Sequence, residues 1–259
     1  MSAHLGGENL APLDLKTSRS VPEPIARIAR LSSPCSACSV RQLTICAALE
    51  EQELAEISAI LSRLELEPGD PLFFEGEPAQ HLFNVTTGAV KIYKLLADGR
   101  RQRTGFLCPG DCLGLANDET YAYSATAITK TWVCRFPRGK LEALLKRFPK
   151  MEQRLFAVAN HELAVAQEQM LLLGRKTARE KIASFLLMLS GRAVRRGQMD
   201  NPVSVPMTRA DIGDYLGLTT ETVSRTFTQL RKSGMITLLP DGKVQLNGRD
   251  RLEEVAEGG

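Results

Sequence analysis

The chain lacks any apolar run long enough to cross a membrane. Its densest apolar stretch, "IASFLLML" at residues 182–189, falls far short of the ~20 residues that a membrane span requires. The N-terminus carries no basic and then apolar leader; residues 1–34 are polar with scattered prolines and are expected to be disordered. We therefore expect a cytoplasmic protein that does not interact with membranes.

Histidine is also scarce, with three residues in a chain of 259. His4, His81 and His161 lie far apart, and each is expected to be a surface residue rather than an axial haem ligand. The sequence offers no nucleophile paired with a base and no glycine-rich phosphate loop. An enzyme is therefore not expected.

Cysteine is distributed differently, because three of the six fall within the segment "PCSACSVRQLTIC". Cys35, Cys38 and Cys46 follow a C-x2-C-x7-C spacing. In a reducing compartment, clustered cysteines bind metals or sense redox state more often than they form structural disulfides. Iron–sulfur clusters are commonly held by four thiolates with one ligand supplied from afar, whereas structural zinc sites usually contain two close pairs. The candidates for a fourth ligand are Cys108, Cys112 and Cys134.

The organisation of the chain predicts an α+β fold. Residues 50–64 place apolar side chains on one stripe of a helix. From about residue 65 to 140, short apolar runs alternate with turn glycines, and Asp98-Gly99 is a hairpin signal. We predict a sensory domain over residues 35–140, built from the cysteine loop and an antiparallel β-roll of roughly eight short strands.

A long helix is predicted next, over residues 141–174. Small and apolar residues recur in it at steps of three and four, which is the spacing of a coiled-coil seam. This seam can mediate a homodimer, or alternatively pack against the chain's own β-roll. The residues of the expected dimer seam are Leu155, Ala159, Leu163, Ala166, Met170 and Leu173.

The C-terminal third is basic, since residues 175–249 hold 13 Lys and Arg against 6 Asp and Glu. Within it, "TRADIGDYLGLTTETVSRTFTQLRKSGMI" at 208–236 contains two capped helical patterns separated by a turn at Gly217. Two β runs joined by Asp241-Gly242 follow as a wing. This arrangement predicts a winged helix-turn-helix that binds double-stranded DNA, in a domain over residues 175–250.

The polar face of the second of these helices has the chemistry to recognise bases. Arg225 can donate two hydrogen bonds to guanine, Glu221 can accept one from cytosine, and Ser224 can add a less selective bond. The alternative is a surface ion pair between Glu221 and Arg225. The residues expected to contact DNA are Thr208, Arg209, Thr219, Thr220, Glu221, Ser224, Arg225 and Thr228.

These segments resemble a known family. The helix-turn-helix sequence resembles the DNA-binding domain of the CRP/FNR superfamily of bacterial transcription regulators. The glycine-punctuated segment "EPGDPLFFEGEPAQHLFNVTTGAVKIYKLLADGRRQRTGFLCPGDCLGL" resembles that superfamily's cyclic-nucleotide-binding-like β-roll. The resemblance implies a homodimer on palindromic DNA, with RNA polymerase as a further partner. The Glu221, Ser224 and Arg225 pattern implies the FNR-type half-site TTGAT.

The resemblance also indicates which effector the sensory domain responds to. CRP-like members bind the phosphate of a cyclic nucleotide with an arginine before Ser or Thr, where this chain has Tyr123 before Ser124; a cyclic nucleotide is therefore not expected. The cysteine triplet resembles the cluster segment of FNR proteins, in the longer spacing of the FnrL and FnrN variants. "TWVCRFP" matches the FNR context of the distant ligand at Cys134. The resemblance thus implies a 4Fe–4S cluster on Cys35, Cys38, Cys46 and Cys134, and an oxygen-sensing regulator of anaerobic or microaerobic genes.

Two alternatives stay open. The first is a family member that binds DNA independently of oxygen and uses its cysteines for zinc or thiol redox chemistry. The second is an oxidoreductase acting through its C-x2-C motif, which requires a βαβ context that the polar segment before Cys35 does not provide.

Overall fold

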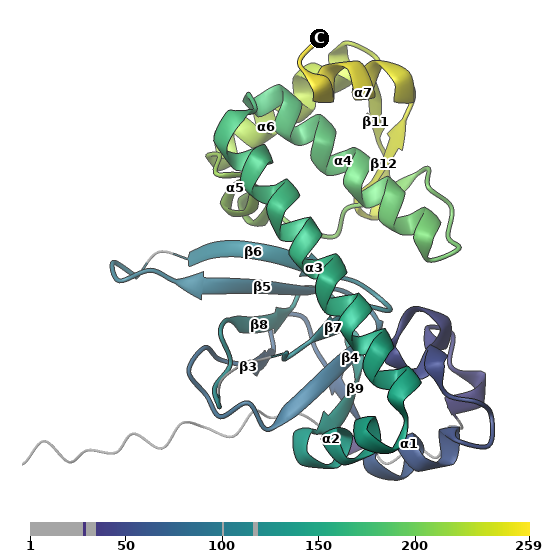
Figure 1. Cartoon of the computed structure of the whole chain (residues 1–259). Coiled ribbons are helices and arrows are strands. Elements are labelled where there is room, and N and C mark those ends of the chain that lie inside the picture. Colours follow the sequence, from purple (N-terminus) through teal and green to yellow (C-terminus); the bar gives the residue numbers. More distant parts are fainter. Residues whose placement is uncertain (1–27, 30–34, 100, 116–118) are drawn as a thin grey trace, which may run out of the picture.

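The computed structural model describes residues 28–29, 35–99, 101–115 and 119–259. A β-roll and a C-terminal domain are connected by a long helix, which runs across one side of the roll and up to the second domain (Figure 1). The predicted tail over residues 1–34 lies outside the described residues, apart from a short strand, β1 (Ile28–Ala29), that pairs with the next strand of the roll. Among the described helices, none is long and apolar enough to cross a membrane.

The β-roll consists of two antiparallel sheets. One sheet has the strand order β1-β2-β9-β4-β7 and the other β3-β8-β5-β6. Leu66, Val85 and Ala125 are among the buried residues that fill the space between them. The eight strands described after β1 agree with the predicted number; they are β2 (Ser62–Leu66), β3 (Pro71–Phe73), β4 (His81–Thr87), β5 (Val90–Leu95), β6 (Arg101–Leu107), β7 (Cys112–Leu113), β8 (Ser124–Ala127) and β9 (Thr131–Pro137).

The helix predicted over residues 50–64 is shorter in the structure. Helix α1 covers Leu54–Ile60, and Leu61 is already extended. Leu64 lies in β2, where it pairs with Val133 of β9. The stripe of apolar residues that predicted a longer helix is thus shared between a helix and a strand, because the pairing of β2 with β9 buries Leu64 as effectively as helical packing does.

The long helix predicted over residues 141–174 is two helices in the structure. Helix α2 covers Arg138–Arg147 and helix α3 covers Pro149–Arg175. Proline is favoured in the first turn of a helix and disfavours helical conformation in the residue before it. The break at Phe148 therefore follows from Pro149, and the candidate dimer helix begins there.

The C-terminal domain is a winged helix-turn-helix, as predicted. Helix α5 ends at Gly217, which adopts the left-handed conformation with φ 64°. A Cβ atom on Gly213 would lie 2.6 Å from the Leu218 carbonyl oxygen, so this glycine allows the turn to pack closely on α5. The elements are α4 (Ala178–Arg195), β10 (Val203–Ser204), α5 (Arg209–Leu216), α6 (Thr220–Lys232), β11 (Ile236–Leu238), β12 (Lys243–Leu246) and α7 (Arg249–Glu257).

A polar junction connects the roll to this domain. At its centre Asp211, in the first turn of α5, accepts hydrogen bonds from Lys91 Nζ at 2.8 Å and Arg103 Nε at 3.1 Å. Its other oxygen accepts from the Thr208 hydroxyl at 2.9 Å. One buried carboxylate therefore caps a helix of the DNA-binding domain and anchors two cations of the roll.

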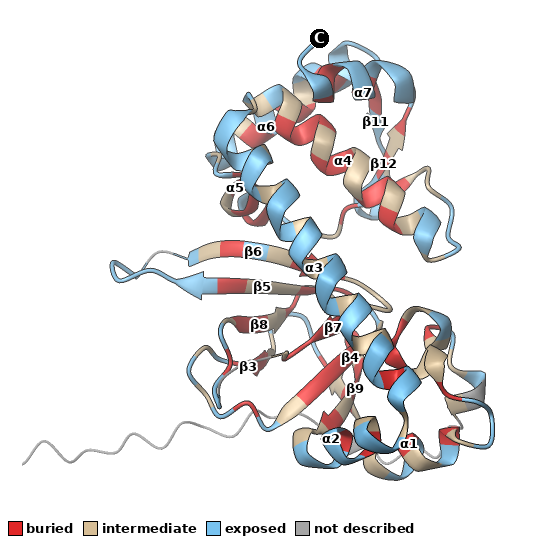
Figure 2. Cartoon of the chain, in the orientation of Figure 1, coloured by how far each residue is buried: buried red, intermediate tan, exposed pale blue. Residues whose placement is uncertain are grey.

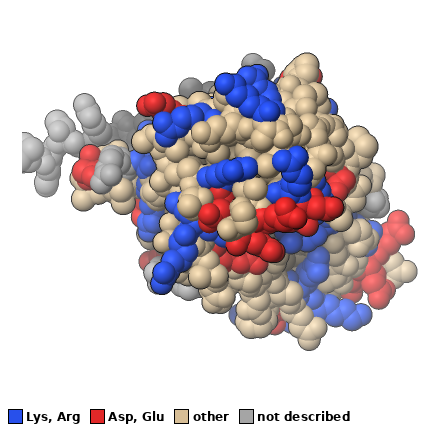
Figure 3. Space-filling view, turned by 90° about the horizontal axis from the view of Figure 1, so that it is seen from above, with Lys and Arg blue, Asp and Glu red and all other residues tan. Residues whose placement is uncertain are grey.

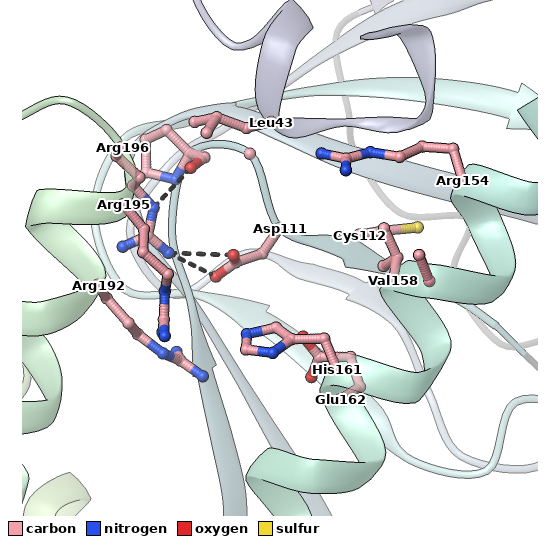
Figure 4. A pocket seen from close by; sticks show the side chains of 13 residues that line it. Leu43, Asp111, Cys112, Arg154, Val158, His161, Glu162, Arg192, Arg195 and Arg196 are labelled. Atoms are coloured by element: carbon pink, nitrogen blue, oxygen red, sulfur yellow. Dashed lines mark hydrogen bonds and ion pairs between the residues drawn. The ribbon is translucent and has the colours of Figure 1, made fainter. Parts of the chain in front are cut away.

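The junction continues at the end of α4. Arg196 donates two hydrogen bonds to the Asp111 carboxylate, at 3.0 and 2.9 Å, from the other side of the domain boundary (Figure 4). A cavity of about 360 Å³ lies beside this ion pair, between α3, α4 and the turn before β7. The polar and charged residues that line it are Asp111, Arg154, His161, Glu162, Arg192, Arg195 and Arg196.

The Asp211 contacts predict a pH-dependent stability. Burial raises the pKa of Asp211, but hydrogen bonds from Lys91 and Thr208 and the Lys91 charge outweigh it, so the pKa is lowered from its ordinary value. This stabilisation is present above the unfolded-state pKa and is lost as the pH falls through the lower folded-state pKa. We expect Asp211→Asn to reduce the free energy of unfolding in urea by about 3 kcal/mol at pH 7, and by less as the pH falls below about 4.

Asp214→Asn is the matched control, because Asp214 is 42% exposed and its nearest cation atom, on Arg103, is 3.9 Å away. This variant is expected to lose less than about 1 kcal/mol. If the two variants lose equal free energy of unfolding, or if the loss in Asp211→Asn is independent of pH, the contacts of the ionised Asp211 carboxylate are not the source of the stabilisation.

Candidate cysteine site and DNA-binding surface

The cysteine triplet lies on a loop of three short 3₁₀ helices, Cys35–Ala37, Arg41–Leu43 and Ile45–Ala48. The Thr44 hydroxyl caps the last of these and accepts a hydrogen bond from the Cys46 amide at 3.3 Å. Arg41 donates to the Leu49 carbonyl oxygen at 2.7 Å and closes the loop. Local hydrogen bonds therefore fold the segment so that its three thiols are held on one short stretch of chain.

The fourth candidate comes from the sheet. Cys134 lies in β9, the central strand of the five-stranded sheet, and is buried with 7% of its surface exposed. Directly opposite it are Arg63 in β2 and Asn84 in β4. Opposed residues of antiparallel strands point to the same face of the sheet. The face that carries Cys134 is therefore also the face of Arg63 and Asn84.

The loop and the sheet meet at one cavity. Of the six cysteines, Cys35, Cys38, Cys46 and Cys134 line this cavity, and Cys108 and Cys112 are not among its lining residues. None of the six forms a disulfide. The other lining residues are Val40, Thr44, Leu61, Arg63, Asn84, Thr86 and Phe136.

Burial governs the acidity of two of these thiols. Burial raises the pKa of the Cys46 thiol to about 11, with further contributions from the charges of Cys35 and Cys38. Burial also raises the pKa of Cys134 to about 12, and the charge of the other three cysteines adds to the shift. The thiols of Cys46 and Cys134 thus keep their protons near neutral pH unless an added positive charge, such as that of metal ions, stabilises the thiolate.

The donor set is of the kind that an iron–sulfur cluster uses. Four thiolates, three from one loop and one from a distant strand, are what such a cluster requires. Within the described residues no three His, Cys, Asp or Glu side chains are close enough to hold a single metal ion; the four sulfurs share a cavity instead. The buried Asn84 Oδ1 also has no hydrogen-bond partner there, so the cavity contains an unused polar group.

The cysteine loop packs directly on α3 through a cluster that we call the loop core. It contains Ile45, Leu49, Cys134 and Met151, with Leu155 packed against it. Arg154 in α3 also donates to the carbonyl oxygen of Gln42 in the loop, at 3.3 Å. The other buried residues of the loop core are Leu54, Ile57, Leu82, Cys112, Phe136, Leu141 and Leu144.

The outer face of α3 is exposed over most of the helix (Figure 2). Five of the six residues predicted for a dimer seam lie on this face, and Leu155 instead is half-buried against the loop core. Phe156 is 67% exposed and lies seven residues before Leu163, at the same position of a heptad. The exposed apolar seam is therefore Phe156, Ala159, Leu163, Ala166, Met170 and Leu173.

Helix α6 has the two faces that the sequence predicted. Val223, Phe227 and Leu230 are buried, while Glu221 and Arg225 are exposed on the opposite face. Thr219 caps the helix by accepting a hydrogen bond from the Thr222 amide at 3.1 Å. Thr220 and Ser224 are also exposed, and Thr228 is half-buried.

In the described structure Glu221 and Arg225 do not form the ion pair that was the alternative interpretation. Within the part of the chain that the structure describes, neither side chain makes a hydrogen bond or salt bridge, whereas Arg249 and Glu253, at the same spacing, form one. Both remain free to contact bases.

Four of the residues predicted to contact DNA are held by intramolecular contacts: Thr208, Arg209, Thr219 and Thr228. The Thr208 hydroxyl is engaged in the capping box with Asp211. The Arg209 guanidinium lies 3.4 Å from the centre of the Phe227 ring, and burial lowers its pKa. Viewed from the end of the molecule that carries the C-terminal domain, Lys and Arg side chains are interrupted by a group of Asp and Glu (Figure 3). The basic excess therefore does not form one continuous patch on this face.

Comparison with known proteins agrees with this architecture. The cyclic nucleotide-binding domain family matches residues 63–148, and the Crp-like helix-turn-helix domain family matches residues 180–255. The transcriptional activatory protein AadR of Rhodopseudomonas palustris is 43% identical over 205 residues, which is 79% of this chain and 86% of that protein. The chain belongs to the CRP/FNR family of transcription regulators.

Other relatives support the same assignment. The transcriptional activator protein FnrL of Cereibacter sphaeroides is 38% identical over 79% of this chain and 84% of its own length. The structure of FixK2 from Bradyrhizobium japonicum is 39% identical and covers 76% of this chain and 97% of its own, with a TM-score of 0.71. As a CRP/FNR regulator the chain is a DNA-binding protein and not an enzyme, and its family implies that it acts as a dimer.

Proposed function

We propose that this CRP/FNR regulator is an oxygen-responsive transcription activator, in which Cys35, Cys38, Cys46 and Cys134 hold a 4Fe–4S cluster. The observation that carries the proposal is the meeting of these four cysteines at one cavity that Cys108 and Cys112 do not line. The names of the relatives include both FnrL and a nitrogen fixation regulation protein FixK. The sensory role therefore depends on the cysteines of this chain.

The proposed cofactor supplies a group that oxygen can destroy. The residues of the chain couple that group to the dimer helix. With Cys35, Cys38 and Cys46 anchored beside Cys134, the loop is held against α3 by Ile45, Leu49 and the Arg154 contact to Gln42. Release of the loop removes that support from the N-terminal half of α3. A change at the cysteines is thus passed to the dimer helix through a shared core.

The exposed seam of α3 is where we place the dimer contact. Two copies paired along it present two α6 helices to DNA, as palindromic half-sites about one helical turn apart require. Glu221, Ser224 and Arg225 then face the TTGAT half-site, and transcription activation involves contact with RNA polymerase. We propose no cyclic nucleotide in the roll, because Tyr123 stands before Ser124 where CRP-like members carry the phosphate-binding arginine, and the Phe73 and Tyr121 rings stack at 3.8 Å in the roll core.

The test is iron and acid-labile sulfide per chain after strictly anaerobic purification, repeated after brief exposure to air. The expected result is about four of each per chain, lost in air together with the dimer and with binding to a TTGAT palindrome. No iron in either sample, with operator binding intact, would leave the family assignment standing and reject the cluster.

Base recognition has its own test, Arg225→Ala. Loss of a bidentate contact costs about 1–3 kcal/mol, so operator affinity should fall about tenfold to a hundredfold while binding to unrelated DNA changes little. Electrophoretic mobility shifts at fixed salt measure both. Arg231→Ala is the control, because Arg231 is equally exposed but lies at the far end of α6; an equal loss there would indicate a general charge effect.

A further inference from the structure

The register of the sheet surrounds Cys134 with two polar residues. In β2, β9 and β4, the residues Arg63, Cys134 and Asn84 are directly opposite one another. Opposed side chains of this kind lie on one face, with Cβ atoms about 5 Å apart. Arg63 and Asn84 also line the cavity of the four cysteines. Cys134, the one cysteine of the described sheet that lines this cavity, is therefore flanked by Arg63 on one side and Asn84 on the other.

Arg63 is a half-buried cation that lacks a hydrogen-bond or ion-pair partner among the described residues. By contrast, Arg135 of β9 donates to Ser62 of β2, and Lys130, just before β9, pairs with Glu65 of β2. A half-buried charge in the absence of a partner is costly. Thiolates of the cysteines that line the same cavity could balance this charge.

Arg63 also lines a neighbouring cavity. The second cavity has a volume of about 320 Å³ and shares Cys38, Arg63 and Thr86 with the first. Its remaining lining residues are Ala37, Ser39, Thr87 and Trp132. Arg63 and Cys38 therefore line both cavities.

Asn84 supplies the second polar group. It is 2% exposed, and its Oδ1 has no hydrogen-bond partner in the described structure. The two ends of a side-chain amide have the same shape, so the amide can present its NH₂ group to the cavity. Sulfur atoms held by the four cysteines would accept that hydrogen bond.

We propose that Arg63 and Asn84 are positioning residues that set the charge and hydrogen bonding around the cluster, Arg63 as the counter-charge and Asn84 as a hydrogen-bond donor to sulfur. This inference rests on the proposed function. Four thiolates make the bound group net negative, and its reduction potential depends on net charge and on hydrogen bonds to sulfur. A nearby cation makes the group harder to oxidise; removing the cation makes it easier to oxidise.

The experiment compares Arg63→Gln with Arg63→Lys and with Arg135→Gln, all purified anaerobically with the full chain. Arg135 lies next to Cys134 in β9 and so points to the opposite face. We expect Arg63→Gln to keep its iron without oxygen, to lose it in air about fivefold faster than the parent protein, and to have a more negative reduction potential. Arg63→Lys and Arg135→Gln should match the parent protein.

Asn84→Leu provides a second measurement, since it keeps the branched shape and the number of heavy atoms of the side chain and removes the donor. It is expected to shift the potential in the same direction, with an unchanged circular dichroism spectrum. If the parent protein holds iron but Arg63→Gln and Asn84→Leu both decay at its rate, the inference is overturned and the proposed function stands. If the parent protein holds no iron, the proposed function fails and the inference fails with it.

Discussion

Cys134→Ala is expected to abolish stable iron binding. The triplet supplies three thiolates from a loop that only short 3₁₀ helices and local hydrogen bonds keep in shape. Cys134 is the ligand that ties this loop to the central strand of the sheet. We expect iron per chain after anaerobic purification to fall at least about tenfold, and operator binding to fall with it.

The controls are Cys108→Ala and Cys112→Ala, which test the other two candidates. Cys112 is the more demanding control, because it lies opposite Asn84 in β7, as Cys134 does in β9. All three residues thus share one face, but Cys112 is two strands away from Cys134, about 10 Å. Cys112→Ala leaves only a small void, costing about 1 kcal/mol, and should retain iron. Iron retained in Cys134→Ala and lost in Cys112→Ala would reassign the fourth ligand.

The choice of the fourth ligand shows how far the sequence could predict the site. Spacing alone identified Cys35, Cys38 and Cys46 as a set, because they are neighbours in the chain. It could not choose among the three distant cysteines, since that choice depends on which strands are adjacent. The family context of "TWVCRFP" indicated Cys134, and the structure places that residue, and neither alternative, at the cavity.

The residues that the sequence did not reveal are those whose role depends on strand pairing. Nothing in the local sequence of Arg63 or Asn84 distinguishes them from other polar residues of short strands. Only the register of β2 and β4 against β9 brings them to Cys134. By contrast, the winged helix-turn-helix was predicted correctly because caps, turn glycines and apolar stripes are local signals.

Two boundaries were missed for different reasons. Pro149 was a readable signal for the break between α2 and α3, and a helix that begins there makes Phe156 part of the heptad. The end of α1 at Ile60 had no such signal. Leu64 fits a helical stripe and a strand equally well, and only the pairing of β2 with β9 decides between them.

Leu163→Glu is expected to make the protein monomeric. Leu163 is 58% exposed in the single chain and lies in the middle of the α3 seam. In a two-fold dimer the same residue from each copy meets at the axis, so the variant would bring two carboxylates together in an apolar contact. Sedimentation should show a monomer, and affinity for a full palindrome should fall at least about a hundredfold, because one half-site no longer assists the other.

Ala164→Glu is the matched control, since Ala164 is the next residue, is exposed and lies off the seam. It adds the same charge to the same helix and should remain dimeric. Leu163 is not part of the loop core, so Leu163→Glu should keep its iron when purified without oxygen. Iron retained without a dimer would show that the cysteine site acts before dimerisation. If iron is lost together with the dimer, a stable cysteine site requires the partner copy. The coupling would then run from the dimer contact to the cysteine site, which is the reverse of the direction proposed here.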